Sequence, residues 1–538
     1  MREFLNRLAN NRSLLSKLLI ASFLVNILAL ATPIFVIQVL QRYVAYGVTS
    51  TLVTLVIGIL FIIIFEFFFR NIRHRMAREY ELSNIAIANS VLNKLTVIKS
   101  HIFETASKFR NDIINRNINT VRNTYTASNI LVILDVPFAA IFLLALFLIH
   151  YQLGILTLIF IILPFAVNGY YGNKINKLSG QNEVISTSIF RIFDNAITRN
   201  LTVKFFNLLK PLSASWNVIA NKIVNNKENL EASINTQSSF FHGISSILTV
   251  AVIGWGATLA VDGQISVGAL IGANILAARC LMPIVKFVQT QENIVKGEKA
   301  SKEIQMFLSI PSDNGTGREI KDFKGSIQCS NLQFIYPKSK NPIFENLDLN
   351  LHSGQITVIT GRNGSGKSTL IKVLAGILDF TKGSLNLDQI AINQVSLIWL
   401  REQLSYSPQE PTFLDGTLGE NIIGSKKLEG DKFSRLLLDV DLLNFVNSHE
   451  KGINMALDNR GEDLPLGIRK RISHARSLVN KGKIVLMDEP TEGLDLVGKK
   501  AIIKLLSTFK EENKTVVVAT NDQDIIDLSD QSVELNIK

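Results

Sequence analysis

Cysteine is scarce in this chain of 538 residues, which holds only Cys280 and Cys329. Because one lies in a long apolar run and the other in a more polar region, we expect no disulfide framework. The sequence also shows no cluster of cysteine and histidine with the spacing of a zinc site. These absences exclude a small disulfide-bonded secreted protein and a zinc-binding module.

Charged residues are also few, at 19% of the chain, whereas soluble proteins carry about a quarter. Apolar residues make up 47% and crowd into long runs before about residue 290. The net charge of +11 comes without a nucleic-acid recognition motif, so we expect no nucleic-acid partner. The composition predicts a transmembrane domain over residues 1–300, a linker over 301–324 and a soluble domain over 325–538.

The apolar runs have the length of membrane-spanning helices, each near the roughly 20 residues that a bilayer requires. No cleavage site follows the first run, so we expect it to remain in the membrane and not to be removed as a signal peptide. The six runs are Leu18–Leu40, Leu52–Phe69, Ile130–Ile149, Leu153–Tyr171, Ile244–Val261 and Ile265–Val288.

Basic residues between the runs predict the orientation. They gather before the first run, after the second run and in the long polar stretch 172–239, whereas Arg42 is the only one in the three short connections. Basic loops stay on the cytoplasmic side. The pattern predicts a multi-pass membrane protein with both termini in the cytoplasm and helices that extend beyond the bilayer.

Four ionisable residues lie within or near the runs. Glu66 and Arg70 stand four apart and can pair on one helix face. Asp135 precedes Pro137 at the start of the third run, and Arg279 interrupts the sixth. Charged groups at membrane depth are candidates for a functional site, although each could instead snorkel or form a structural pair.

A phosphate-binding loop is the clearest motif of the soluble part. An expected strand, Gln355–Thr360, runs into the pattern G-x-x-x-x-G-K-S, and a helix should follow. Glycines let backbone N–H groups surround phosphates, Lys367 would reach the terminal phosphates, and the Ser368 hydroxyl would ligate Mg²⁺. The loop residues are Gly361, Arg362, Asn363, Gly364, Ser365, Gly366, Lys367, Ser368 and Thr369.

An acidic pair follows a second apolar strand, Lys483–Met487. Asp488 and Glu489 would therefore lie at the carboxyl edge of a parallel sheet, where nucleotides bind in α/β folds. Asp488 would hold Mg²⁺ and Glu489 would polarise the attacking water. The alternation of strands and helices from about residue 325 predicts an α/β P-loop domain after an α-helical six-span transmembrane domain.

These motifs, in this order and spacing, resemble those of ATP-binding cassette proteins. The resemblance implies ATP and Mg²⁺ as cofactors, stacking of Tyr336 on adenine, and a glutamine loop in which Gln409 contacts Mg²⁺ and faces the membrane domain. It also implies that residues 493–495 cross between two cassettes of a dimer.

The chain departs from the family pattern at two places. The signature loop, normally Leu-Ser-Gly-Gly-Gln, reads Leu464-Pro465-Leu466-Gly467-Ile468, and only Gly467 remains to approach the γ-phosphate of the partner cassette. Pro465 supplies neither a hydroxyl nor an N–H. Asn521 stands where the family places a histidine; an asparagine can bond phosphate but cannot carry a proton in the same way.

These departures predict slow turnover. Losing one such transition-state contact typically costs about 10²–10³ in rate. The resemblance implies a second half-transporter as partner: a homodimer would carry both defects at both sites, whereas a heterodimer would spread them over two sites. We expect tight ATP binding with weak hydrolysis in a homodimer; alternatively, the loops have changed without large consequence.

The membrane half narrows the resemblance to permease-ATPases of type I secretion. The segments that carry it are 29–39, Asp135-Val136-Pro137-Phe138, 262–273 and 415–422. The resemblance implies a location in the bacterial inner membrane and export of an unfolded protein or peptide, with a periplasmic adaptor and an outer-membrane channel as partners. Only residues 1–17 precede the first run, so we expect no N-terminal peptidase domain. Two alternatives stay open, a lipid or small-molecule exporter and a nucleotide-binding subunit that does not transport.

Overall fold

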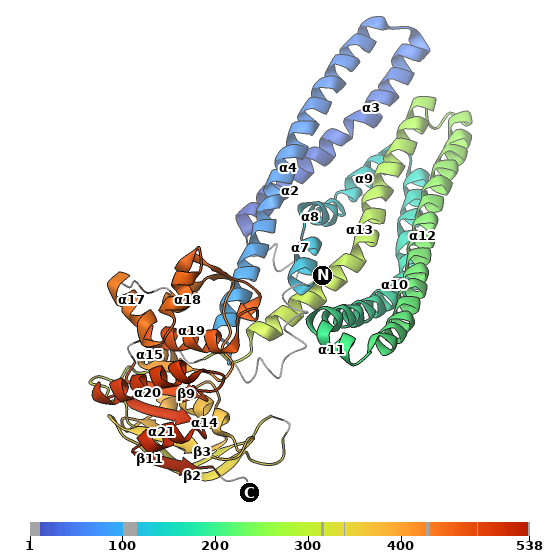
Figure 1. The fold of residues 1–538 in the computed structure, drawn as a ribbon. Helices are drawn as coiled ribbons and strands as arrows, with labels where there is room; N and C mark the ends of the chain where they lie inside the picture. The colour runs from blue at the N-terminus through green and yellow to red at the C-terminus, as the bar shows by residue number, and fades with distance from the viewer. Residues whose placement is uncertain are drawn as a thin grey trace. The chain divides into compact units, whose positions relative to one another are not determined.

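The computed structural model describes residues 11–99, 116–313, 317–337, 339–424, 426, 430–480 and 482–535, without the side chains of residues 82–84. The chain forms two compact units. The first comprises Met1–Asn93 and Lys108–Ser309, and the second comprises Lys94–Ser107 and Ile310–Lys538. Figure 1 shows the first unit as long helices and the second as mixed sheets and helices.

Helices account for the first unit. In the described part of the chain, six of its helical segments are long and apolar enough to cross a membrane, which confirms the predicted six spans. Their elements are α2 (Arg12–Ala29), α3 (Ala31–Gln38), a π-helix η1 (Val39–Val44), α4 (Thr49–Val97), α7 (Ile118–Thr124), α8 (Ala127–Asp135), α9 (Ala139–Ile149), α10 (Tyr151–Thr198), α11 (Asn200–Phe205), α12 (Leu209–Val261) and α13 (Val267–Leu308).

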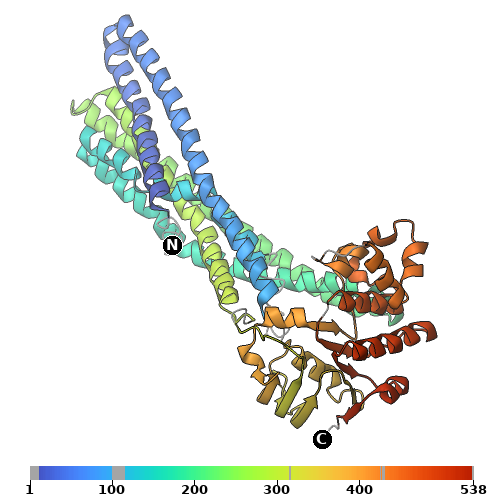
Figure 2. The same ribbon diagram turned by 90° about the vertical axis from the view of Figure 1, so that its left-hand side faces the viewer.

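Several of these helices continue far beyond their apolar runs. Helices α10 and α12 lie side by side over much of their length (Figure 1 and Figure 2). The chain turns between α12 and α13 at Gly263, whose φ of 72° suits a residue without a side chain. Pro137 separates α8 from α9, because proline has no N–H to continue the helical hydrogen bonds.

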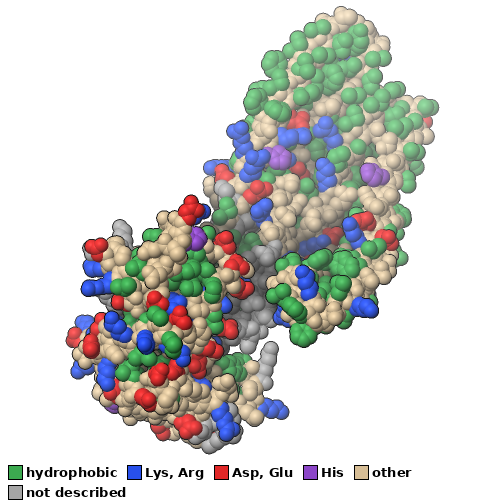
Figure 3. Space-filling model, viewed as in Figure 1, with side chains coloured by type: hydrophobic (Ala, Val, Ile, Leu, Met, Phe, Trp, Pro, Cys, Tyr) green, Lys and Arg blue, Asp and Glu red, His purple; other side chains and the backbone are tan. Residues whose placement is uncertain are grey.

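Large apolar side chains point outward from the membrane unit. Phe61, Phe67 and Phe68 on α4 are each 58–62% exposed, and Figure 3 shows hydrophobic side chains covering α3 and α4. A water-soluble protein would bury such residues, whereas contact with lipid leaves them outside. The outward apolar surface therefore agrees with the six spans.

A buried ion pair joins two helices of this unit. Arg73 of α4 is 7% exposed, and its guanidinium donates to both carboxylate oxygens of Asp135 on α8, at 2.5 and 3.2 Å. Ser22 and Asn26 of α2 add longer contacts to the same pair. The predicted pair of Glu66 and Arg70 also forms.

Two sheets organise the second unit. The five-stranded sheet has the order β11-β3-β10-β9-β6, and every neighbouring pair is parallel, as predicted. A separate four-stranded antiparallel sheet, β2-β1-β4-β5, was not anticipated from the sequence. The strands are β1 (Ile327–Phe334), β2 (Phe344–Leu351), β3 (Ile356–Thr360), β4 (Lys382–Leu387), β5 (Ile390–Ala391), β6 (Leu404–Ser407), β9 (Ile484–Asp488), β10 (Thr515–Ala519) and β11 (Gln531–Glu534).

Helices cover the parallel sheet and form a smaller subdomain. Strands β9 and β10 are buried along their whole length, as expected of central parallel strands with helices on both faces. Strands β7 (Gly416–Thr417) and β8 (Ala456–Leu457) form a short third ladder. The helices are α14 (Lys367–Leu374), α15 (Leu397–Gln403), α16 (Leu418–Ile423), α17 (Gly430–Asp439), α18 (Leu443–Ser448), α19 (Leu466–Val479), α20 (Leu496–Glu511) and α21 (Gln523–Leu528).

Candidate functional site

The phosphate-binding loop joins β3 to the start of α14. Strand β3 ends at Thr360 and α14 begins at Lys367, so the loop lies at the carboxyl edge of the parallel sheet. Gly361, Gly364 and Gly366 have φ of 144°, 85° and 98°, which L side chains rarely adopt. A Cβ at Gly366 would also approach Ile343 Cγ2 to 2.4 Å. The loop conformation therefore requires glycine.

Lys367 lies folded across this loop. Its side chain is 7% exposed, and Nζ donates to the carbonyl of Gly361 at 2.7 Å. The same nitrogen stands 3.9 Å from Glu489 Oε1. The ammonium thus lies between the loop and the end of β9, where a phosphate would meet both.

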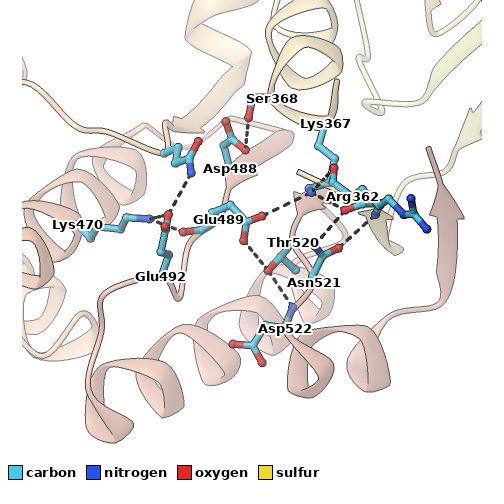
Figure 4. Close-up of polar contacts among 12 residues, drawn as sticks. Arg362, Lys367, Ser368, Lys470, Asp488, Glu489, Glu492, Thr520, Asn521 and Asp522 are labelled. Atoms are coloured by element: carbon cyan, nitrogen blue, oxygen red, sulfur yellow. Dashed lines mark hydrogen bonds and ion pairs between the residues drawn. The ribbon is translucent and has the colours of Figure 1, made fainter. Parts of the chain in front are cut away.

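Ser368 and Asp488 lie in direct contact. The Ser368 hydroxyl donates to Asp488 Oδ1 at 3.0 Å, and Asp488 is 3% exposed at the end of β9 (Figure 4). Burial raises the pKa of Asp488, while the Ser368 hydrogen bond and nearby lysines oppose that shift. Hydroxyl and carboxylate oxygens are the ligands that Mg²⁺ prefers, so the pair fits that ion beside a phosphate.

Among the described residues, no group of three or more His, Cys, Asp or Glu could hold a metal by itself. A metal at Ser368 and Asp488 would thus depend on oxygens from a nucleotide or water. One unpaired donor points to such a ligand: the buried Ser365 hydroxyl of the loop has no hydrogen-bond partner.

Glu489 has an unusual backbone conformation. Its φ of 44° lies in the left-handed region, which costs a residue with a side chain about 1–3 kcal/mol. Its N–H donates to the carbonyl of Ala519 on β10 at 2.8 Å, and its Oε2 accepts from Thr520 Oγ1 at 3.1 Å. Burial raises the pKa of Glu489, and the Thr520 hydrogen bond and Lys367 act against that rise. Sequence reasoning missed Thr520.

Asn521 is held by the loop glycine. Its Nδ2 donates to the carbonyl of Gly361 at 3.0 Å, and its Oδ1 accepts from the N–H of the same glycine at 3.2 Å. Each polar atom of the amide thus makes one hydrogen bond with the backbone just after β3, and these two bonds leave the second N–H of Nδ2 unused. The prediction that this amide can hydrogen-bond a phosphate stays a prediction.

A cavity of about 450 Å³ gathers most of the predicted residues. Such a volume is within the range of small-molecule sites. Tyr336 lines it and shares a hydrogen bond with Thr369 at 3.0 Å. An adjoining cavity is lined by Glu489 and Asn521, and Gln409 lines both. The first cavity is lined by Tyr336, Ile343, Arg362, Asn363, Gly364, Ser365, Gly366, Lys367, Ser368, Thr369, Gln409 and Glu489.

Gly467, at the start of α19, lines neither cavity but lies against Gly493 and Leu494, which line the adjoining one. A Cβ at Gly467 would stand 3.0 Å from the carbonyl oxygen of Gly493, and the Leu466 side chain packs against the same loop glycine. Pro465 caps α19 without a side-chain hydrogen bond. The altered signature loop thus packs on residues 493–494 of its own chain.

Two charged residues that sequence reasoning missed adjoin Glu489. Lys470 of α19 is 1% exposed and donates to the backbone carbonyl of Glu489, and its ammonium lies 3.7 Å from Glu492 Oε2 (Figure 4). Gln409 Nε2 also donates to Glu492 Oε2, at 3.1 Å. The sequence did carry a sign of this buried lysine. Lys470 stands four residues from both Leu466 and His474, so the three share one face of the helix, and the spacing predicts that this face is buried.

The sequence matches two family descriptions that correspond to these two units. Residues 15–284 match "ABC transporter transmembrane region" and residues 344–492 match "ABC transporter". The chain therefore belongs to the ABC transporters, which are multi-pass membrane proteins that bind and hydrolyse ATP.

The chain is also similar to individual ABC transporters. The chain is 24% identical over 523 residues to the alpha-hemolysin translocation ATP-binding protein HlyB of Escherichia coli O157:H7, covering 96% of this chain and 74% of that one. It is 26% identical over 537 residues to the lactococcin-G-processing and transport ATP-binding protein LagD of Lactococcus lactis subsp. lactis, with the same coverage. A bacterial Atm1-family ABC exporter with ATP bound has the same fold, with a TM-score of 0.84, 18% identity and coverage of 98% and 94%.

Proposed function

We propose that the chain is the permease-ATPase of a type I secretion-like system that exports an unfolded protein or peptide across the bacterial inner membrane. The observation that carries the proposal is a cavity lined by Lys367, Ser368 and Glu489, with Asp488 hydrogen-bonded to Ser368 beside it, in a chain with six candidate spans. Relatives named for the translocation of hemolysin and the transport of lactococcin G support a polypeptide substrate.

The residues divide the work on ATP among themselves. Tyr336 would stack on adenine, and the N–H groups of loop 361–368 would surround the phosphates with Lys367. Ser368, Asp488 and Gln409 would hold Mg²⁺, which neutralises charge on the phosphates when bound. Glu489 would accept a proton from the attacking water, and its contacts with Thr520 and Lys367 orient its carboxylate.

The same geometry supports tight binding with slow turnover. The phosphate loop is complete, so nucleotide binding is retained. Asn521 is engaged with Gly361 at both its amide atoms, and it lacks a titratable group. Gly467 follows a proline cap and a leucine, so α19 offers a weaker site for the γ-phosphate of a partner cassette.

Assembly and orientation follow from the same proposal. We place residues 1–300 as the transmembrane domain, 301–324 as the linker and 325–538 as the cassette, with both termini in the cytoplasm. A second half-transporter, identical or different, would complete the nucleotide sites. A periplasmic adaptor and an outer-membrane channel would complete the export path, as the resemblance to type I secretion implies.

ATPase rates of three proteins test the hydrolytic part of the proposal. These are the natural chain, Glu489→Gln, and a variant that combines Pro465→Ser, Leu466→Gly and Asn521→His. We expect weak turnover that Glu489→Gln abolishes and that the triple substitution accelerates. Ordinary family turnover by the purified natural homodimer would contradict slow hydrolysis, and no loss in Glu489→Gln would contradict the assigned base.

The substrate class requires its own experiment. Reduced, alkylated polypeptide should change the ATPase rate of the natural chain in nanodiscs, whereas the same protein in its folded form should not. Equal effects of both forms, or a response only to added lipid, would contradict polypeptide export.

A further inference from the structure

We propose that Lys470 and Glu492 form a charged brace that positions Glu489 for its reaction. The inference rests on the proposed function, because that function gives Glu489 the attacking water. Lys470 lines neither cavity, and Glu492 lines only the adjoining one, so Lys470 acts through the backbone and neighbours of Glu489. Lys470 is therefore a positioning residue.

Lys470 is a charged residue buried in the domain. An ammonium that is 1% exposed loses nearly all its water and must be compensated by acceptors and opposite charge. Two groups supply these: the backbone carbonyl of Glu489 and the Glu492 carboxylate, 3.7 Å away. A leucine or methionine would fill this face of α19 without that cost, so the charge itself calls for a role.

The Lys470 ammonium holds the backbone of Glu489. The left-handed backbone of Glu489 is fixed at both its peptide groups, because its N–H donates to Ala519 and its carbonyl accepts from Lys470. With the backbone fixed at φ 44°, the side chain points toward Thr520 and Lys367 (Figure 4). Strained backbone at a reacting group persists only where neighbours hold it.

Gln409 joins the brace through Glu492. Glu492 Oε2 accepts from Gln409 Nε2 at 3.1 Å while it faces Lys470. Gln409 also lines the phosphate-loop cavity, so the brace reaches from α19 to a residue beside the nucleotide. Neutralising Glu492 would remove the carboxylate with the largest charge effect on the Lys470 ammonium, with only the more weakly acting Glu489 and Asp488 remaining, and would weaken the link between α19 and Gln409.

Hydrogen exchange of the nucleotide-free full chain tests the brace without requiring hydrolysis. Lys470→Met should increase deuterium uptake of the peptide that contains residues 484–495, because the Glu489 carbonyl loses the Lys470 ammonium and keeps only the N–H of Glu492, at 3.3 Å, as its donor. The matched control is Lys510→Met, which removes a lysine–aspartate pair with Asp530 from the same domain. Uptake unchanged by Lys470→Met, or raised equally by Lys510→Met, would overturn the proposal.

Kinetics separate positioning from mere stability. Lys470→Met should lower kcat roughly tenfold to a hundredfold with little change in ATP affinity, since small misplacements of a reacting group cost rates of that order. Lys470→Gln keeps an N–H donor for the Glu489 carbonyl and should recover part of the loss. A lower melting temperature with unchanged kcat would overturn positioning.

Two further comparisons keep the outcomes distinct. If Lys470→Met does not fold, three other proteins are compared. Deuterium uptake near Glu489 should be lowest in the natural chain, higher in Glu492→Gln and highest in Lys470→Gln. Equal uptake in all three would overturn the proposal. If the natural chain hydrolyses ATP no faster than Glu489→Gln, the proposed function fails, and hydrogen exchange alone decides whether the brace exists.

Discussion

Asn521 clasps the backbone of Gly361, giving one hydrogen bond to its carbonyl at 3.0 Å and accepting one from its N–H at 3.2 Å. The first glycine of the phosphate loop is thereby tied to the end of β10. The Asn521 side chain is thus a part of the loop's support. Its substitution should therefore change nucleotide binding as well as turnover.

Asn521→Asp provides the sharpest test of this contact. The carboxylate keeps the shape of asparagine but loses the donor to Gly361, sets an oxygen against a carbonyl and adds negative charge near the phosphates. We expect ATP affinity to fall by at least about tenfold, which corresponds to about 1.4 kcal/mol. Titration of the purified chain with a fluorescent ATP analogue measures it.

The control for this variant is Asn513→Asp, which makes the same chemical change just after the end of α20. Its ATP affinity should match that of the natural chain. Equal affinity of Asn521→Asp and the natural chain would show that the clasp does not support the loop.

The buried pair of Arg73 and Asp135 carries the second prediction. Asp135→Asn leaves a guanidinium that is 7% exposed without its counter-charge. Because the Asp135 side chain is 25% exposed, we expect the cost to lie below that of breaking a fully buried pair, which is about 3–5 kcal/mol. The melting temperature of the detergent-solubilised chain should fall clearly. Glu66→Gln removes a pair whose arginine is 56% exposed, and such surface pairs contribute about 0.3–0.5 kcal/mol.

A double substitution distinguishes an unpaired charge from a general packing defect. Replacing both Arg73 and Asp135 by leucine removes the charge that Asp135→Asn leaves behind, so it should restore part of the lost thermal stability. A double variant less stable than Asp135→Asn would contradict this explanation.

The parts of the site that could be predicted from the sequence are those built from short contiguous motifs. The phosphate loop and Asp488 with Glu489 are contiguous in sequence and follow buried strands, so the parallel topology places them together. The Glu66–Arg70 pair was equally predictable, because residues four apart share a helix face.

Contacts between distant segments were beyond the sequence. Arg73 of α4 pairs with Asp135 of α8, and Lys470 of α19 reaches Glu489 after β9, so the sequence spacing of neither pair predicts its contact. Thr520 immediately precedes Asn521 but was passed over, because its role depends on β9 and β10 being neighbours. The antiparallel sheet was not predicted either: its central pairing joins β1 to the distant β4, although β1–β2 and β4–β5 are neighbours in the chain.

His474 makes stability depend on pH. This histidine is fully buried between Ser407 and the carbonyl of Pro490, and burial lowers its pKa from 6.5 to about 4. The unfolded chain binds a proton at a higher pH than the folded one does. The stability that the neutral His474 contributes is therefore fully present above pH 6.5 and is lost as pH falls toward 4. By pH 5 the loss in the free energy of unfolding amounts to about 2 kcal/mol.

Thermal unfolding at pH 7.5 and pH 5 should reveal this loss in the natural chain. His474→Gln should remove much of the difference between the two pH values, because glutamine does not titrate. His352→Gln replaces an exposed histidine and should leave the difference unchanged. The same pH dependence in His474→Gln as in the natural chain would exclude His474 as its source.

Thr520 carries the last prediction, because its hydroxyl is the one neutral group that donates to the Glu489 carboxylate in the described site. Thr520→Val keeps the shape of the side chain and removes that hydrogen bond. Since the bond lowers the pKa of Glu489 against the effect of burial, its loss should raise that pKa further.

A base must be ionised to accept a proton, so turnover falls as pH drops through the pKa of Glu489. The acid limb of kcat against pH should therefore move to higher pH in Thr520→Val, and kcat at neutral pH should fall. The hydroxyl also accepts from the N–H of Asp522, so the melting temperature is measured in parallel. Thr508→Val, an exposed change on α20, is the control, and an unmoved acid limb in Thr520→Val would argue that another group limits the rate at low pH.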